Sequence, residues 1–143
     1  MTTTSVTDLP PAFARALDRV ADALNAMFVG DPRPYAACWA PSDEATLFGA
    51  WGPVEKGHGP VTTTFDWVGS RFSGGTVSTD YEVVGVGGDL AYTVGFERGR
   101  CRVDGGELAP MTIRVTHVYQ RLNDEWWIVH RHADFPPPDQ RLS

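Results

Sequence analysis

The spacing of apolar residues changes once along this chain, near Thr76, and this change constrains the fold more than any other feature. Before it, residues such as Phe13, Leu17 and Val20 recur at steps of three and four, the period of a helix with one buried face. After it, apolar residues alternate with polar ones, which is the period of a half-buried strand. The sequence therefore predicts helices in the first half of the chain and a sheet in the second.

Glycine and proline divide the two halves into elements. The first helix is predicted to end at Gly30, a short second helix follows over residues 31–39, and a third runs over residues 61–72 and is closed by Gly74-Gly75. An early strand is predicted over residues 45–51, between the second and third helices. This order predicts an α+β fold in which a cone-shaped, curved, mostly antiparallel mixed sheet wraps around three helices from the N-terminal half.

A chain of 143 residues is the size of one domain, so residues 1–143 are expected to fold as a single unit. Residues 1–8 and 135–143 are predicted to be flexible tails, the second because Pro136-Pro137-Pro138 cannot pair in a sheet. The net charge of −6 opposes binding to nucleic acid, which needs clustered Lys and Arg. No leader peptide and no stretch of about 20 apolar residues is evident, so we expect a cytoplasmic protein without membrane contacts.

Three of the four histidines lie close together near the end of the chain, on a predicted β-hairpin. A turn at Asn123-Asp124 places His117 directly opposite His130, and His132 then points to the same face. Imidazoles set into an apolar surface indicate a lined cavity rather than a solvated face. Arg114 and Arg131 fall on the other face of the hairpin, where we expect them to meet solvent or a second subunit.

The histidines suggest proton transfer as the chemistry of this cavity. A neutral imidazole among aromatic side chains has a lowered pKa and can pass a proton near neutral pH. We therefore predict His130 and His132 as catalytic residues, with His117 as their partner. In one alternative all three are core residues satisfied by hydrogen bonds. In another they hold zinc through three nitrogens on one face, with Asp134 orienting a ligand.

Large aromatic side chains are plentiful in this sequence and favour cores and pockets. We predict that the walls of the cavity include six of them and one carboxylate: Trp39, Trp51, Trp67, Tyr92, Tyr119, Trp126 and Asp134.

Two runs of this sequence resemble the SnoaL-like branch of the nuclear transport factor 2-like superfamily. They are Val-Thr-His-Val-Tyr at residues 115–119 and Trp-Trp-Ile-Val-His-Arg-His-Ala-Asp at residues 126–134, and the resemblance extends over nearly the whole chain. It implies a cone-shaped fold, and it implies no metal; we expect no cofactor, and a homodimer as the assembly. It leaves the activity open, because this cone hosts isomerases, dehydratases, cyclases, hydrolases and non-enzymatic association domains.

Two better-known branches of the superfamily match only in part. The general-base aspartate of ketosteroid isomerases corresponds here to Gly49, and the tyrosine donor of their first helix corresponds to Ala23, so that reaction is not expected. The pocket of the calcium/calmodulin-dependent kinase association domain is lined by arginine, whereas His117 and Val94 occupy two such positions here. The closing hairpin is nevertheless similar to that domain in sharing five residues: Arg121, Trp126, Val129, His130 and His132.

These observations lead to two hypotheses about function. In the first, the domain binds a small, mostly apolar molecule and performs an isomerase-, dehydratase- or cyclase-type proton transfer through the histidines. In the second, it is a non-catalytic ligand-binding or association module that has kept the cavity. An enzyme is expected to bring at least two titratable groups within about 3 to 4 Å of one empty point in the cavity, whereas a binding module need not.

Overall fold

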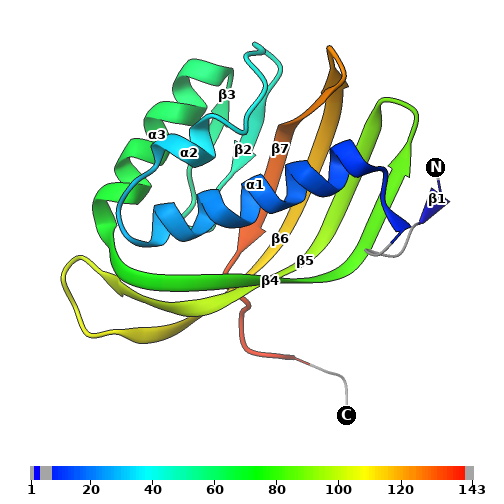
Figure 1. The fold of residues 1–143 in the computed structure, drawn as a ribbon. Coiled ribbons are helices and arrows are strands. Elements are labelled where there is room, and N and C mark those ends of the chain that lie inside the picture. Colours follow the sequence, from blue (N-terminus) through cyan, green and yellow to red (C-terminus); the bar gives the residue numbers. More distant parts are fainter. Residues whose placement is uncertain (1, 4–7, 141–143) are drawn as a thin grey trace.

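The computed structural model describes residues 2–3 and 8–140, which form three helices and a seven-stranded sheet (Figure 1). The strand order is β1-β4-β5-β6-β7-β2-β3, and every neighbouring pair is antiparallel except β2 and β7. The predicted α+β class with a mixed, mostly antiparallel sheet is confirmed. The helices are α1 (Pro11–Phe28), α2 (Arg33–Ala36) and α3 (His58–Arg71); the strands are β1 (Thr2–Thr3), β2 (Thr46–Phe48), β3 (Val54–Lys56), β4 (Phe72–Gly87), β5 (Leu90–Val103), β6 (Ala109–Leu122) and β7 (Glu125–Asp134).

Helix α1 lies across one face of the curved sheet, which we call the inner face, and the main core lies between the two (Figure 1). The apolar stripe expected from the sequence is the buried side of this helix. Phe13 is fully buried there, and its ring meets those of Tyr119 and Trp126 edge-on at centroid distances of 5.0 and 5.1 Å. Gly30 follows the helix with φ 99°, a left-handed conformation that glycine adopts without strain.

Close backbone approach and two bulges bend the long strands β4 and β5. The register of their pairing shifts between Ser73 and Thr76 and again between Tyr81 and Val83. On β5, a Cβ atom placed at Gly99 would lie 1.9 Å from the backbone oxygen of Thr76. Glycine is therefore required where the two strands press together, and the bend that results wraps the sheet around the helices.

The role predicted for Gly74-Gly75 was wrong. Helix α3 ends at Arg71 and the chain passes directly into β4 at Phe72, so the two glycines lie inside a strand. A Cβ atom on Gly75 would lie 2.6 Å from the backbone oxygen of Arg100. The pair of glycines serves the first bulge of β4 rather than the end of a helix.

The hairpin of β6 and β7 has the predicted turn but not the predicted register. Asn123 and Asp124 both have positive φ, as a two-residue hairpin turn requires, and Tyr119 pairs with Ile128 as expected. A bulge follows, and beyond it Val118 pairs with His130. The skipped residue is Val129, so every later side chain of β7 points to the opposite face from the one predicted.

Two different backbone partners explain the position of this bulge. Ile128 exchanges hydrogen bonds of 2.9 Å each with Cys38 and Ala40 in the segment after α2. From His130 onward, β7 pairs instead with the parallel strand β2. The change of partner falls at Val129, where the extra residue is accommodated.

The two tails are described in part. Thr2–Thr3 form strand β1, which pairs with β4, whereas residues 1, 4–7 and 141–143 lie outside the described residues. Phe135 lies within 6.0 Å of Trp51, measured between ring centroids. The flexibility of both tails stays a prediction.

Within residues 2–3 and 8–140, no helix has the length and apolar character needed to cross a membrane.

Candidate functional site

A largely apolar pocket opens between the helices and the inner face of the sheet, near the junction of α3 and β4. It contains about 580 Å³ of space free of protein atoms, its open mouth included, and about 70 Å³ of this admits the centre of a water molecule. The pocket is therefore narrow, with room for a ring or a short chain. All three helices contribute to its walls, and the apolar lining includes Leu24, Phe28, Trp51, Phe65, Val68 and Phe72.

The polar part of the pocket lining includes a buried ion pair between β5 and β7, the two strands on either side of β6. Arg131 on β7 donates to both carboxylate oxygens of Glu97 on β5, at 2.6 and 2.8 Å. Glu97 is 1% exposed and Arg131 is 8% exposed, so both charges are shielded from water. Such a pair is tolerated in a core because each charge satisfies the other in a two-pronged geometry.

Two further polar side chains extend this pair into a cluster of four. His117 on β6 lies beside Arg131, with 3.3 Å between its Nε2 atom and the arginine Nη1 atom. The hydroxyl of Tyr35 on α2 lies 2.6 Å from the same Nε2 atom. Tyr35, Glu97 and Arg131 line the pocket, and His117 is fully buried beside them. We call these four residues the floor cluster.

The protonation state of His117 follows from its neighbours. Arginine can only donate, so Nε2 accepts and the imidazole proton lies on Nδ1. Burial, helped by the positive charge of Arg131, lowers the pKa of His117 well below its ordinary value. Burial also raises the pKa of Tyr35, so its hydroxyl keeps its proton and donates to His117. At neutral pH the floor cluster is therefore uncharged overall.

The local sequence explains why these side chains face inward. On β5 the inward residues are Ala91, Thr93, Gly95 and Glu97, so the apolar alternation of Tyr92, Val94 and Phe96 marks the outer face instead. On β7 the bulge turns Arg131 inward. Tyr35 and Glu97 were not predicted as site residues from the sequence, and Arg131 was predicted to lie on the face away from the cavity. One signal was available, because the apolar side chains of Trp126 and Ile128 stand at even positions, whereas those of Ala133 in the same strand and Phe135 just after it stand at odd positions.

The structure does not bring the three predicted catalytic histidines together. His117 is buried on the inner face, but His130 and His132 lie on the outer face with strand β2. There the hydroxyl of Thr46 lies 2.7 Å from Nδ1 of His130, and the Phe48 ring lies 5.6 Å from His130 and 5.3 Å from His132 between centroids. In the described part of the chain, no three His, Cys, Asp or Glu side chains are grouped to hold a metal ion, so the zinc alternative has no geometric support.

The predicted pocket walls are found in part. Trp51 and Trp67 line the pocket. Trp39, Tyr119 and Trp126 belong to the packed core, where they meet other aromatic rings, and they are not in the lining of this pocket. Tyr92 lies on the outer face over Gly85, and Asp134 forms an ion pair there with Arg114. Both point away from the pocket because their strand positions have the outward parity.

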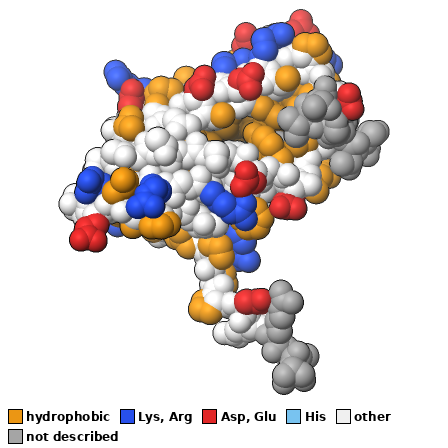
Figure 2. All heavy atoms as spheres, turned by 60° about the horizontal axis from the view of Figure 1, so that its bottom comes forward, with side chains coloured by type: hydrophobic (Ala, Val, Ile, Leu, Met, Phe, Trp, Pro, Cys, Tyr) orange, Lys and Arg blue, Asp and Glu red, His pale blue; other side chains and the backbone are white. Residues whose placement is uncertain are grey.

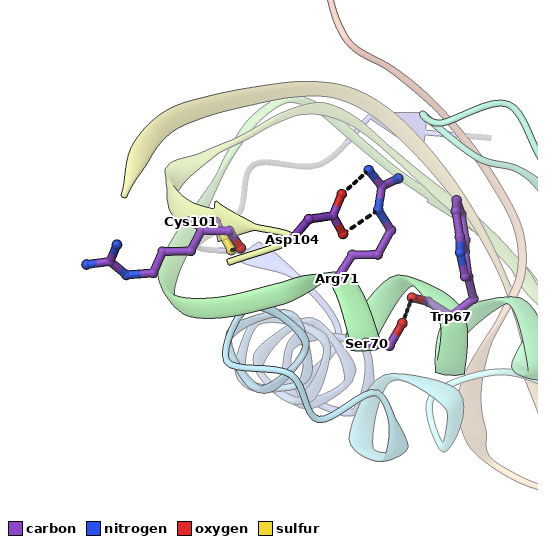
Figure 3. A network of polar contacts seen from close by, with 6 residues as sticks. Trp67, Ser70, Arg71, Cys101 and Asp104 are labelled. Atoms are coloured by element: carbon purple, nitrogen blue, oxygen red, sulfur yellow. Dashed lines mark hydrogen bonds and ion pairs between the residues drawn. The ribbon is translucent and has the colours of Figure 1, made fainter. Parts of the chain in front are cut away.

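A charged pair and two tryptophans stand at the pocket beside the end of α3. The guanidinium of Arg71 donates to Asp104 of the β5–β6 turn at 2.9 and 3.2 Å (Figure 3). Its Cζ atom also lies 3.9 Å from the ring centroid of Trp51 and 5.1 Å from that of Trp67. We call Arg71 and Asp104 the rim pair.

Comparison with known proteins identifies the family. The SnoaL-like domain family matches residues 16–138, and the chain belongs to this family. A search of curated proteins finds no significant match. Many solved structures are similar to this chain, and they include a protein of the nuclear transport factor 2-like superfamily from Salmonella enterica.

Three of these structures illustrate the range of the fold. A proposed dehydratase of the NTF2-like family from Streptomyces avermitilis is 22% identical, with a TM-score of 0.72 over 88% of this chain and 94% of the other. A proposed calcium/calmodulin-dependent protein kinase type II association domain from Thiobacillus denitrificans is 20% identical, with a TM-score of 0.71 over 89% and 97%. A ketosteroid isomerase-like protein from Erwinia carotovora atroseptica is 15% identical, with a TM-score of 0.73 over 89% and 95%. At these identities the likeness establishes the fold alone.

The state of His117 predicts how stability depends on pH. Below about pH 6.5, the unfolded chain protonates this imidazole while the folded protein keeps it neutral, so the free energy of unfolding falls as pH falls. The loss is up to about 1.4 kcal/mol per pH unit for this one group. Urea titrations between about pH 7 and pH 5 should therefore show a shallower pH dependence for His117→Gln than for the natural protein. Parallel curves for the two proteins would contradict the buried neutral imidazole.

Proposed function

We propose that this protein binds a small, mostly apolar molecule in the pocket between its helices and the inner face of the sheet. The observation that carries the proposal is an apolar cavity with a polar floor, formed by Tyr35, Glu97 and Arg131. The ion pair cancels its own charge, so the floor offers hydrogen-bonding groups without a net charge. Such a pocket suits an apolar body with one polar group that the floor can orient.

The matched substitutions Thr64→Phe and Thr63→Phe test this proposal. Both lie on α3, but Thr64 lines the pocket whereas Thr63 is exposed to solvent. We expect calorimetry to detect binding of phenylbutyramide, a neutral ring on a short chain, and to show an affinity at least about tenfold weaker in Thr64→Phe. Thr63→Phe should bind as the natural protein does. No binding by the natural protein, or equal binding by both variants, would sink the proposal.

Proton-transfer catalysis is the second candidate, and the observation that favours it is that ionisable side chains reach the pocket. Tyr35 is the best placed of them, because it lines the pocket and its hydroxyl contacts the neutral imidazole of His117. Both oxygens of Glu97 are engaged by Arg131, which limits that carboxylate as a base. His130 and His132 lie on the outer face of the sheet and are not in the lining of this pocket, so we give them no role in it. Chemical change of a bound ligand, followed by NMR, would distinguish catalysis from binding.

We also propose that two copies associate through the outer face of the sheet. Tyr92, Val94 and Phe96 alternate there on β5, and Phe48, on strand β2 of the same face, is 42% exposed. The same face carries Arg114 paired with Asp134, so a copy related by a twofold axis would meet both signs of charge. The surface charge bears on a different partner: Figure 2 shows acidic and basic side chains interspersed on the side of the molecule that it draws. This mixture supports a small-molecule ligand over nucleic acid as the partner.

Sedimentation equilibrium tests the proposed dimer. We expect twice the chain mass of 15.6 kDa for the natural protein. Val94→Asp should shift the mass toward that of one chain, because it buries a carboxylate in the interface. Val54→Asp, at a 68% exposed position on β3, is the matched control and should leave the mass unchanged. A natural protein that sediments as a single chain would contradict the dimer.

A further inference from the structure

The rim pair lies beside the pocket, although neither of its residues is in the lining. Arg71 is the last residue of α3, and Phe72, which follows it, lines the pocket. The arginine packs against Trp51 and Trp67, two residues of the pocket lining. Figure 3 shows its guanidinium held between the Asp104 carboxylate and the Trp67 ring. A positive charge therefore lies against two tryptophan rings that form part of the apolar lining of the pocket.

The ion pair that occupies Arg71 is easily exchanged. The Asp104 side chain is 60% exposed and that of Arg71 is 24% exposed, so water reaches both. Exposed pairs of this kind contribute little, since water and salt compensate their loss. Another carboxylate that approached from the pocket could take the place of Asp104 at small cost, with the same two-pronged geometry.

The backbone holds Asp104 in position independently of its carboxylate. Its amide donates to the carbonyl oxygen of Arg71 at 2.8 Å, and its φ of 53° places it in the left-handed region of the turn. Asparagine tolerates this conformation as aspartate does. The competing negative charge can therefore be removed without disturbing the turn.

We propose that Arg71 determines ligand specificity, by binding the carboxylate of an amphiphilic molecule whose apolar body fills the pocket. This inference rests on the proposed function and adds the chemical class of the ligand. The floor cluster has no net charge to select for an anion, whereas Arg71 is a fixed cation at the rim. Cation–π contacts with two tryptophans keep its guanidinium oriented when Asp104 is displaced.

A pair of probes that differ only in charge tests the inference. Phenylbutyrate and phenylbutyramide have the same ring and chain, and calorimetry gives the affinity of each. We expect the natural protein to prefer the carboxylate about two- to fivefold, as an exposed ion pair allows. Added salt should reduce this preference.

Three variants assign the preference to the rim pair. Arg71→Gln should bind the two probes equally, because it keeps a polar side chain and loses the charge. Arg71→Lys should keep part of the preference, since lysine retains the charge but not the planar fork. Asp104→Asn should increase the preference by a further factor of about two to five, because it removes the competing carboxylate.

The possible failures can be told apart. If neither probe binds the natural protein, the proposed function and this inference fall together. If both bind with equal affinity, or if Arg71→Gln keeps the preference for phenylbutyrate, the pocket stands and the role of Arg71 is overturned. An unchanged preference in Asp104→Asn would also overturn it, because the proposal requires the two carboxylates to compete.

Discussion

Replacing Glu97 by leucine should lower the free energy of unfolding by about 3 to 5 kcal/mol, measured by denaturant titration. The substitution leaves the guanidinium of Arg131 inside the protein without the carboxylate that accepts both of its hydrogen bonds. A buried charge that loses its partner bears the full cost of leaving water. The Tyr35–His117 contact is expected to loosen as well, since Arg131 lies 3.3 Å from His117.

The double variant Glu97→Leu with Arg131→Met separates the charge effect from simple loss of packing. Both new side chains are apolar and of similar size, so no unpaired charge remains. We expect most of the lost stability to return, because well-packed apolar replacements of buried ion pairs are often neutral or stabilising. A double variant no more stable than Glu97→Leu alone would show that packing, rather than the unpaired charge, sets the cost.

Gly99→Ala should destabilise the protein by about 3 kcal/mol or more, at the upper end of the cost of overpacking. The added methyl group would lie 1.9 Å from the backbone oxygen of Thr76, so β4 and β5 would have to separate. The clash is with backbone, which cannot rotate away as a side chain can. Thermal unfolding followed by circular dichroism would measure the loss.

Gly59→Ala is the control for this substitution. Gly59 lies in the first turn of α3, and a Cβ atom there meets nothing within 4 Å. Alanine favours helix by up to about 1 kcal/mol over glycine, so this change should be neutral or stabilising. If Gly99→Ala is as stable as Gly59→Ala, then close contact between the two strands does not produce the curvature of the sheet.

Most of the elements and their order could be predicted from local patterns, but the short strands β1 and β3 were not predicted. The apolar stripe of α1, the glycine after it and the turn at Asn123-Asp124 each depend on residues close in sequence, and each is found in the structure. The role of Gly74-Gly75 was predicted wrongly because this pair fits a helix end and a strand bulge equally well in sequence. Only the approach of Arg100 from the neighbouring strand distinguishes the two.

The composition of the site could not be predicted from the local pattern of apolar residues, because it depends on pairing between segments that are distant in sequence. The bulge in β7 arises where Ile128 pairs with the segment after α2 while His130 pairs with β2, and both partners are far away in sequence. On β5, the outward residues are the more apolar ones, so alternation alone assigned the faces wrongly and hid Glu97. Of the residues predicted for the site, Trp51 and Trp67 were found in the pocket, and His117 beside it.

Because Val129 is unpaired, the number of residues in β7 determines which of its side chains face the pocket, as much as their identity does. In a relative with the same residues but no bulge in β7, the imidazoles of His130 and His132 would point toward the pocket and the guanidinium of Arg131 would point to the outer face. No substitution would be needed for this exchange. Insertions and deletions near this position are therefore a route by which the interior of such a domain acquires new chemistry in one step. Before a residue's role is transferred from one family member to another, the hydrogen-bond pairing of β7 in the two structures should therefore be compared. A sequence alignment alone does not show which face of the sheet a residue of β7 occupies.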